Sequence, residues 1–310
     1  MQDFIIFSGS SHPVLADEIA AYLGVNLGKR DVCLFPDGEI YIEILEPIQG
    51  RDVFVFQSLG ENPNFHIMET LIMLDALKRG SAASITIVLP YFAYARQDRI
   101  NKPGTPITAK LVADLLTRAG TDNLITMDLH SEAIEGFFDI PVQHLLSSNY
   151  LIPYCQSLNI ENAVVVAPDK GGIKTASFYA KELRVPLALI DKERVNSFHV
   201  EMRFFVGDVK GKSVILLDDM CSTAGTLVSA ANICAELGAQ RIIAIVTHGL
   251  FIQDALEKIE ESPIEMLIVT NSIPLSDEIA RHTKIKIVSI APLLGEAIRK
   301  RGSSLLRMIQ

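Results

Sequence analysis

Residues 214–226 read VILLDDMCSTAGT, and they pass from an apolar run through two carboxylates and a loop of small residues into a helix-period segment. The apolar run Val214–Leu217 is typical of a parallel strand that is buried on both faces. A strand, a turn and a helix in this order form part of a βαβ unit, in which ligands bind beyond the carboxyl end of the strand. The segment therefore predicts an α/β fold with a binding site in residues 218–226.

The same alternation of strands and helices extends along the chain. The predicted strands are Phe4–Phe7, Asp52–Gln57, Ile85–Leu89, Leu124–Met127, Ala163–Ala167, Leu187–Ile190, Val214–Leu217, Ile242–Val246, Met266–Val269 and Ile285–Ser289. The predicted helices are Ile67–Lys78, Ile107–Arg118, Ile173–Leu183 and Thr226–Leu237. This order predicts mainly parallel sheets that are flanked by helices.

The length of 310 residues suits two domains better than one core. Residues 80–88 resemble residues 238–246, and either a duplication or the common βαβ pattern explains the similarity. We expect a boundary near Ser147–Tyr154, which gives domains at residues 1–147 and 148–310. The last helix could pack back on the first domain.

The composition favours a small-molecule site over a nucleic-acid or membrane partner. The net charge is −9 and the pI is about 5.3, which disfavours general binding of nucleic acid. No apolar run approaches the roughly 20 residues of a membrane span, and we see no secretion signal. Cys33, Cys155, Cys221 and Cys234 form no CxxC pair, so we expect reduced thiols in a cytoplasmic protein, with a redox-sensitive Cys221 as the alternative.

Residues 218–226 combine groups that suit a sugar phosphate. The N-terminus of the helix attracts an anion, and the hydroxyl side chains of the segment add donors. Gly225 permits close approach of the backbone, and the carboxylates of Asp218 and Asp219 can accept hydrogen bonds from sugar hydroxyls or hold Mg²⁺. A helix cap with two solvated acids is the alternative interpretation.

Other polar segments also follow predicted strands. Asp169–Gly172 is either an anion-binding turn or an ordinary one, and Asp191–Arg194 is either a mobile catalytic loop or a solvated charge run. The guanidinium groups in Arg96–Arg99 suit phosphate oxygens. Phe35–Glu39 offers an aromatic ring and carboxylates to a purine but is equally a hairpin turn, and His130 alone is most often structural.

Residues 218–226 resemble the motif that binds 5-phosphoribosyl 1-diphosphate (PRPP), which occurs in phosphoribosyltransferases and in PRPP synthases. Further segments together resemble the ribose-phosphate diphosphokinase family over nearly the full length. The segments that carry this resemblance are Phe7–Ser10, Phe35–Glu39, Pro90–Arg99, Pro106–Ala113, Met127–His130, Gly136–Pro141 and Ile273–Glu278.

The resemblance implies two similar phosphoribosyltransferase-like domains, each a mainly parallel sheet flanked by helices. It implies transfer of the diphosphoryl group of ATP to the 1-hydroxyl of ribose 5-phosphate, with Mg²⁺ as cofactor, which gives PRPP and AMP for nucleotide biosynthesis. It also implies a homo-oligomer, built from dimers and expected to be a hexamer, in which the segment around Asp37 reaches the ATP site of a neighbouring subunit.

The resemblance also assigns roles to single residues. The implied catalytic residues are Lys192 and Arg194. The implied ATP-binding residues are Phe35, Asp37, Gly38, Glu39, Arg96, Gln97 and Arg99. The implied ribose 5-phosphate site comprises Asp218, Asp219, Ser222, Thr223, Ala224, Gly225 and Thr226, and the diphosphate loop comprises Asp169, Lys170, Gly171 and Gly172. The implied metal-binding residues are His130 and Asp169.

Two other functions remain open at this point. A phosphoribosyltransferase, or a regulator of the pyrimidine pathway, would not need the segments Phe35–Glu39 and Arg96–Arg99. A catalytically inactive, regulatory relative would be expected to lack the lysine or the acid pair, whereas Lys192, Asp218 and Asp219 are all present.

Overall fold

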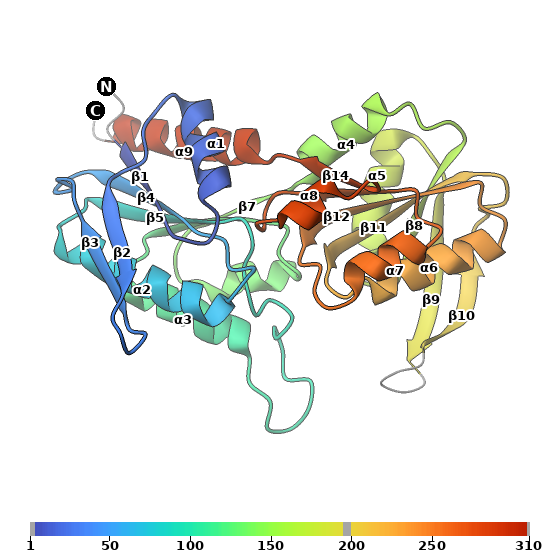
Figure 1. Cartoon of the computed structure of the whole chain (residues 1–310), viewed down its shortest axis with the longest axis horizontal. Coiled ribbons are helices and arrows are strands. Elements are labelled where there is room, and N and C mark those ends of the chain that lie inside the picture. Colours follow the sequence, from blue (N-terminus) through green and yellow to red (C-terminus); the bar gives the residue numbers. More distant parts are fainter. Residues whose placement is uncertain (1–3, 195–199, 309–310) are drawn as a thin grey trace. The chain divides into compact units, whose positions relative to one another are not determined.

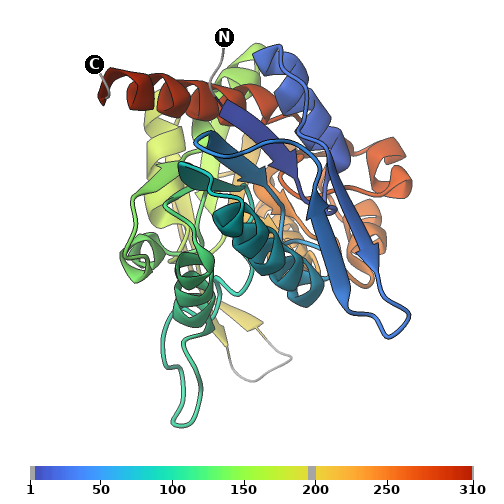
Figure 2. The ribbon, with the colours of Figure 1, turned by 90° about the vertical axis from the view of Figure 1, so that its left-hand side faces the viewer.

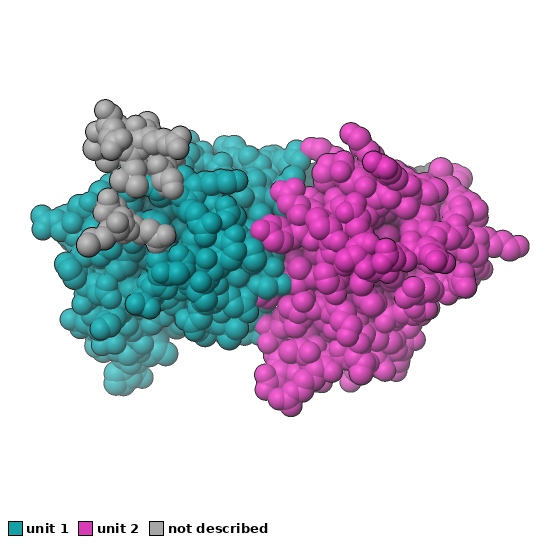
Figure 3. All heavy atoms as spheres, turned by 90° about the horizontal axis from the view of Figure 1, so that it is seen from above, with its two compact units in different colours: residues 1–146, 272–274, 289–310 teal, residues 147–271, 275–288 magenta. Residues whose placement is uncertain are grey.

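The computed structural model describes residues 4–194 and 200–308, and for residues 191–194, 200–203 and 303–308 it describes the backbone alone. The chain divides into two compact units, which Figure 3 colours separately. Unit 1 comprises residues 1–146, 272–274 and 289–310, and unit 2 comprises residues 147–271 and 275–288. The C-terminal segment therefore belongs to the same unit as the N-terminal segment.

Unit 1 contains a parallel sheet with the strand order β1-β4-β5-β6-β7. Its strands are β1 (Phe4–Ser8), β4 (Asp52–Phe56), β5 (Ser84–Leu89), β6 (Asn123–Met127) and β7 (Val142–Leu145). Its helices are α1 (Pro13–Leu23), α2 (Pro63–Arg79), α3 (Thr108–Ala119), α9 (Ala291–Met308) and the 3-10 helix η1 (Glu132–Phe137). The strands β2 (Arg30–Leu34) and β3 (Ile40–Ile44) form a separate antiparallel hairpin. Figure 1 shows α1 and α9 on one face of the sheet and α2 and α3 on the other.

Unit 2 contains a larger sheet with the strand order β10-β9-β8-β11-β12-β13-β14. Neighbouring strands are parallel, except that β10 pairs with β9 in the antiparallel direction. Its strands are β8 (Ala163–Ala167), β9 (Leu187–Arg194), β10 (Val200–Val206), β11 (Ser213–Cys221), β12 (Arg241–Gly249), β13 (Met266–Thr270) and β14 (Ile285–Val288). Its helices are α4 (Ser148–Ser157), α5 (Ile173–Leu183), α6 (Gly225–Glu236), α7 (Ala255–Glu261) and α8 (Asp277–Arg281). The predicted α/β class with mainly parallel sheets flanked by helices is confirmed.

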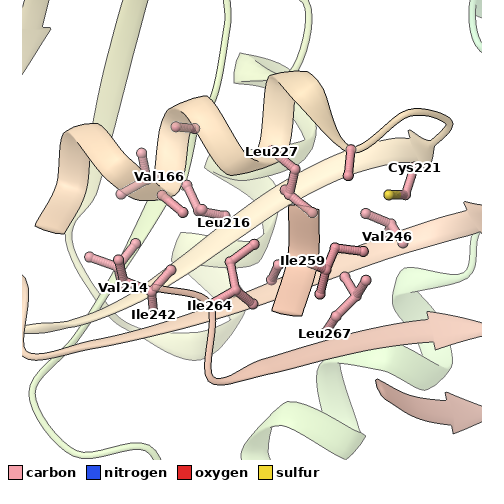
Figure 4. Close-up of a cluster of buried hydrophobic side chains, with 14 of the residues drawn as sticks. Val166, Val214, Leu216, Cys221, Leu227, Ile242, Val246, Ile259, Ile264 and Leu267 are labelled. Carbon is pink, nitrogen blue, oxygen red and sulfur yellow. The ribbon is translucent and has the colours of Figure 1, made fainter. Parts of the chain in front are cut away.

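The core of unit 2 explains why its central strands are apolar throughout. Val214 and Leu216 of β11 pack with Leu227 of α6 in one cluster, which Figure 4 shows. Ile215, which alternates with them, packs with Tyr179 of α5 in a second cluster on the opposite face. Burial of each such large apolar side chain stabilises the fold by roughly 1.5–3 kcal/mol.

Helix α9 packs closely on α1 within unit 1. A Cβ atom at Gly295 would lie 2.4 Å from Cδ1 of Tyr22, so only glycine fits there without movement of the ring. The hydroxyl of Tyr22 donates to Oε1 of Glu296 at 2.7 Å, and the guanidinium of Arg299 lies 5.2 Å from the centre of the Tyr22 ring. These contacts hold the C-terminal helix on unit 1.

Each predicted strand and helix is present, with ends that differ by a few residues. The sequence pattern did not identify several outer elements as strands. β2 and β7 carry polar residues and contain no fully buried residue, so neither shows the apolar run by which the central strands were recognised.

Two strands continue further than predicted. Residues 191–194, expected as a mobile loop, lie in β9, because β10 pairs with them and extends the ladder to Arg194. Asp218 and Asp219, expected after the strand, lie within β11, which pairs with β12 as far as Cys221. The helix predicted at Ile107–Arg118 is α3, which begins one residue later than predicted, at Thr108.

Within the ranges that the structure describes, no helix is both long and apolar enough to span a bilayer.

None of the four cysteines, all of which the structure describes, forms a disulfide bond. Cys155, Cys221 and Cys234 are buried, and Cys33 is exposed. Burial raises the pKa of Cys155 and of Cys221 to about 12, which disfavours the alternative of a redox-sensitive Cys221.

A pair of threonine substitutions tests the cost of a buried hydroxyl. Thr126 is fully buried in β6, and its hydroxyl has no hydrogen-bond partner among the described residues. We expect Thr126→Val to raise the free energy of unfolding by about 1 kcal/mol, measured by urea denaturation, because it removes an unpaired polar group. The matched control is Thr270→Val in β13, where the buried hydroxyl donates to the Thr247 carbonyl at 2.6 Å, and we expect a loss of about 1 kcal/mol. Equal losses in both variants would contradict this account.

Candidate functional site

The chain reverses its direction across the sheet of unit 2 between β8 and β11. From β8 the chain passes through α5 to β9 on one side, and it then returns to β11 on the other side of β8. The connecting helices α5 and α6 pack in the clusters on opposite faces of the sheet. The loops after β8 and β11 therefore diverge, and this is the position at which open α/β sheets bind ligands.

Both loops lead into helix N-termini that lack the usual caps. The N-cap residues are Gly172 for α5 and Ala224 for α6, and neither supplies a side-chain hydrogen bond to its helix. Neither helix has an acidic residue in its first turn. Because the first N–H groups of a helix carry partial positive charge, such ends suit a bound anion, and at α5 the carboxylate of Asp169 already accepts a hydrogen bond from the N-cap residue Gly172.

The backbone of the loop after β11 is specialised at Ala224. This residue has a φ of 59°, in the left-handed region, whereas Gly225 begins the helix. A Cβ atom at Gly225 would meet protein atoms only at 3.7 Å, so the protein itself does not require glycine there. The predicted reason for Gly225, close approach of a ligand to the backbone, thus stays a prediction.

Three predicted site carboxylates come together at the ends of β8 and β11. Oδ1 of Asp169 accepts a hydrogen bond from Gly172 N at 3.1 Å, and Oδ1 of Asp218 accepts one from Asp219 N at 2.9 Å. Burial, followed by the negative charges of Asp219 and Asp169, raises the pKa of Asp218 to about 8. The three carboxylates are therefore not easily ionised together when no ligand is bound.

The predicted phosphate-binding arginines of unit 1 lie on the loop after β5. Arg96 and Arg99 are exposed, and Nε of Arg99 lies 3.9 Å from Oδ1 of Asp98. Gln97 is tied to the start of α3, because its carbonyl accepts from Ala109 N at 3.2 Å and its side chain accepts from the hydroxyl of Thr108. The side chain of Gln97 thus has a hydrogen-bond partner within the protein, in addition to its predicted contact with ATP.

His130 lies on the next loop of unit 1, after β6. Since β5 and β6 are parallel neighbours, their carboxyl ends place the loops of Arg96–Arg99 and His130 at the same edge of the sheet. His130 is exposed. Sequence reasoning did not identify the pair behind this loop, His144 and Glu135, because neither belongs to a motif with a recognisable spacing.

The predicted adenine contacts lie on the tip of the β2–β3 hairpin. Phe35 is 48% exposed, and its ring packs edge-to-face on Tyr41 with centroids 5.7 Å apart. Arg30 anchors the base of the hairpin by donating to the carbonyl oxygens of Ser8 at 2.6 Å and Gly9 at 3.1 Å. Figure 2 shows that the hairpin tip and the loop between β5 and α3 project at separate positions on unit 1.

For the predicted catalytic residues, the structure describes the backbone alone. The backbones of Lys192 and Arg194 pair with Met202 and Val200 of β10, and their side chains lie outside the described part of the chain. The described residues contain no group of three or more His, Cys, Asp or Glu side chains that could hold a metal ion by themselves. His130 and Asp169 belong to different units.

The chain matches known family models over most of its length. Residues 4–120 match the N-terminal domain of ribose phosphate pyrophosphokinase, and residues 202–305 match the phosphoribosyl synthetase-associated domain. A ribose-phosphate pyrophosphokinase of Wolinella succinogenes is 48% identical over 300 residues, which cover 97% of this chain and 96% of the relative. The chain belongs to the ribose-phosphate pyrophosphokinase family. The resemblance to the ribose-phosphate diphosphokinases, the same family under another name, is confirmed.

Other members of the ribose-phosphate pyrophosphokinase family agree in sequence and fold. The enzyme so named from Bacillus caldolyticus is 49% identical over 295 residues, which cover 95% of this chain and 93% of the relative. The crystal structure of the phosphoribosylpyrophosphate synthetase from Mycobacterium smegmatis superimposes with a TM-score of 0.92 at 41% identity, over 97% of this chain and 99% of that chain. The fold of this chain is thus that of an enzyme of this family.

The raised pKa of Asp218 predicts a pH-dependent loss of stability. In the unfolded chain an aspartate has its ordinary pKa of about 4, whereas in the folded protein the pKa of Asp218 is raised to about 8. The ligand-free protein should therefore lose stability as the pH rises from about 4 to 8, with no further loss above 8. Asp218→Asn removes this loss, so its advantage in melting temperature should grow over that window.

The control for this prediction is Asp208→Asn. Hydrogen bonds from Lys210 and Lys212 lower the pKa of the exposed Asp208, so its stabilising effect should disappear only as the pH falls. Its difference from the wild type should stay constant between pH 5 and pH 8. Melting curves in a chelator check both variants, and a constant difference for Asp218→Asn would contradict the prediction.

Proposed function

We propose that this enzyme transfers the diphosphoryl group of ATP to the 1-hydroxyl of ribose 5-phosphate, which gives PRPP and AMP for nucleotide biosynthesis. The observation that best supports the proposal is the meeting of Asp169, Asp218 and Asp219 with two uncapped helix N-termini at the β8–β11 reversal. This arrangement presents acceptors for sugar hydroxyls beside donors for phosphate groups. Family membership agrees with it.

Ribose 5-phosphate is proposed to bind on the loop after β11. The 5-phosphate accepts hydrogen bonds from the N-terminus of α6 and from the hydroxyls of Ser222, Thr223 and Thr226, with Ala224 and Gly225 shaping the backbone. The ring hydroxyls donate to Asp218 and Asp219. Burial, followed by the negative charges of Asp219 and Asp169, raises the pKa of Asp218 to about 8, and hydrogen bonds donated by the sugar would offset part of this cost of ionisation.

The ATP phosphates are proposed to bind arginines and the diphosphate loop. Arg96 and Arg99, which offer planar forks of N–H donors, bind the triphosphate, with Gln97 beside them, and residues 169–172 receive the diphosphate of the product. As the 1-hydroxyl attacks the β-phosphorus, negative charge grows on the phosphoryl oxygens and on the leaving AMP. Lys192 and Arg194 are proposed to stabilise that charge.

The donor set at the β8–β11 reversal fits Mg²⁺ that is shared with substrate. Mg²⁺ prefers oxygen ligands and in nucleotide sites is usually bound by one or two carboxylates plus phosphate oxygens, rather than by a cage of protein ligands. Asp169 is proposed to supply such a carboxylate, and His130 is proposed to contact the metal–nucleotide complex. When bound, Mg²⁺ would neutralise charge on the phosphate oxygens.

The adenine is proposed to bind a hairpin tip from a neighbouring subunit. Within one chain the tip projects at a position separate from the loop that carries Arg96 and Arg99 (Figure 2). Phe35 would stack on the base, and Asp37 and Glu39, on either side of Gly38, would accept hydrogen bonds from its amino group. We therefore propose a homo-oligomer, built from dimers into a hexamer, that acts in the cytoplasm on small molecules, with no nucleic-acid or membrane partner.

The reaction is tested by identifying the nucleotide product. Purified protein with Mg²⁺, ATP and ribose 5-phosphate should release equal amounts of AMP and PRPP. Lys192→Ala should lower kcat by about 100- to 1000-fold, by analogy with the loss of other groups that stabilise transition-state charge. Release of ADP would indicate transfer of a single phosphoryl group and contradict the mechanism, and absence of turnover would favour a regulatory relative.

The shared site is tested by mixing two impaired variants. As separate homo-oligomers, Phe35→Ala should have a raised KM for ATP, and Lys192→Ala should have its kcat lowered by about 100- to 1000-fold. After subunit exchange, a Phe35→Ala subunit that retains Lys192 can receive an intact hairpin from a Lys192→Ala neighbour. We therefore expect part of the activity to return in the mixture. If ATP were bound by one chain alone, mixing would restore nothing.

A further inference from the structure

The loop that carries His130 is fastened from behind by two side chains. Nε2 of His144, on β7, lies 3.0 Å from the backbone N of Leu129. Nδ1 of the same ring lies 2.6 Å from Oε1 of Glu135, which belongs to η1. The imidazole thus bridges three segments of unit 1: the loop after β6, the strand β7 and the helix η1.

The hydrogen bonds define the state of the imidazole. A backbone N–H can only donate, so Nε2 of His144 must act as the acceptor toward Leu129. The proton of the neutral ring is then on Nδ1, from which it is donated to the carboxylate of Glu135. The side chain of His144 is 11% exposed and that of Glu135 is 39% exposed, so the bond to Leu129 is shielded while the carboxylate stays hydrated.

This arrangement replaces the sheet ladder where the ladder ends. The pairing of β6 with β7 ends at Met127 and Leu145, and the next residue, Asp128, donates its N–H to the Leu145 carbonyl at 3.1 Å. Asp128 has a φ of 39°, which turns the chain away from the strand. The N–H of Leu129 therefore points out of the ladder, and His144 supplies its acceptor.

We propose that His144, oriented by Glu135, is a positioning residue that holds the backbone at Leu129 and thereby sets the direction of the His130 side chain. The inference rests on the proposed function, in which His130 contacts the metal–nucleotide complex. Residues behind a ligating group are known to matter in this way, because they restrict its orientation before the ligand arrives. Neither His144 nor Glu135 touches substrate in this proposal.

The test measures binding of Mg²⁺ with α,β-methylene-ATP by calorimetry, since this analogue cannot release AMP. His144→Phe keeps an aromatic ring but has no acceptor for Leu129, and we expect affinity for the nucleotide complex to fall by about 10- to 100-fold. Affinity for ribose 5-phosphate, which is proposed to bind in unit 2, should not change. His144→Gln offers an amide oxygen to Leu129 and should recover most of the loss.

The chain offers a matched control at His282 in unit 2. Nδ1 of His282 lies 3.3 Å from Lys284 N, and Nε2 lies 3.4 Å from Oε2 of Glu260. His282→Phe therefore removes a comparable pair of contacts, from a side chain that is 15% exposed, at the junction of α8 and β14. We expect a similar change in melting temperature but no change in nucleotide affinity.

The possible outcomes separate this inference from the proposed function. Wild-type protein that does not bind the nucleotide complex would contradict the proposed function itself. Wild-type binding with unchanged affinity in His144→Phe, or equal losses in His144→Phe and His144→Gln, would overturn the positioning role alone. If His144→Phe does not fold, Glu135→Ala takes its place: weaker nucleotide binding would support the role, and unchanged binding would overturn it.

Discussion

The parallel pairing of β8 with β11 is the constraint on which the candidate site depends. Because α5 and α6 leave these neighbouring strands toward opposite faces of the sheet, their N-termini begin beside each other and then separate. The pairing is stabilised by apolar residues that alternate between two buried clusters, so a shift of the register by one residue would move each side chain to the opposite face and disrupt the packing of both clusters. The polar residues at the strand ends are thereby held together by packing that lies below them.

The same packing accounts for the unusual charge of the site. Asp218 and Asp219 lie within β11, where both residues are half-buried between buried neighbours, so their carboxylates are partly shielded from solvent. Their repulsion, together with that of Asp169, is a cost that the folded protein carries until donors or cations bind. The N-termini of α5 and α6, whose N-cap residues supply no side-chain hydrogen bond, carry partial positive charge a short distance along the chain. A ligand that carries both hydroxyl donors and a phosphate would relieve both at once, and ribose 5-phosphate is such a ligand.

Unit 1 shows a second way of holding functional residues. Its loops after β5 and β6 are not fastened by the sheet alone: Gln97 is bonded to the first turn of α3, and Leu129 is bonded to His144. Such contacts join residues on different elements, 11 positions apart for Gln97 and Thr108 and 15 for Leu129 and His144, and none of them changes the local pattern of apolar and polar residues. These hydrogen bonds determine the conformation of the loops that carry the predicted site residues.

The sequence by itself determined the α/β class, the central strands and helices, and the segments that carry the predicted site, because buried parallel strands are uniformly apolar and ligand loops follow them. It also sufficed for the family, since those segments occur together. Only the tertiary structure decided that β9 and β11 extend through their predicted loops, because strand length depends on the partner strand β10 or β12. The structure alone also brought Asp169 to Asp218 and His144 to Leu129, since contacts between separate segments arise from sheet order and not from local residue pattern.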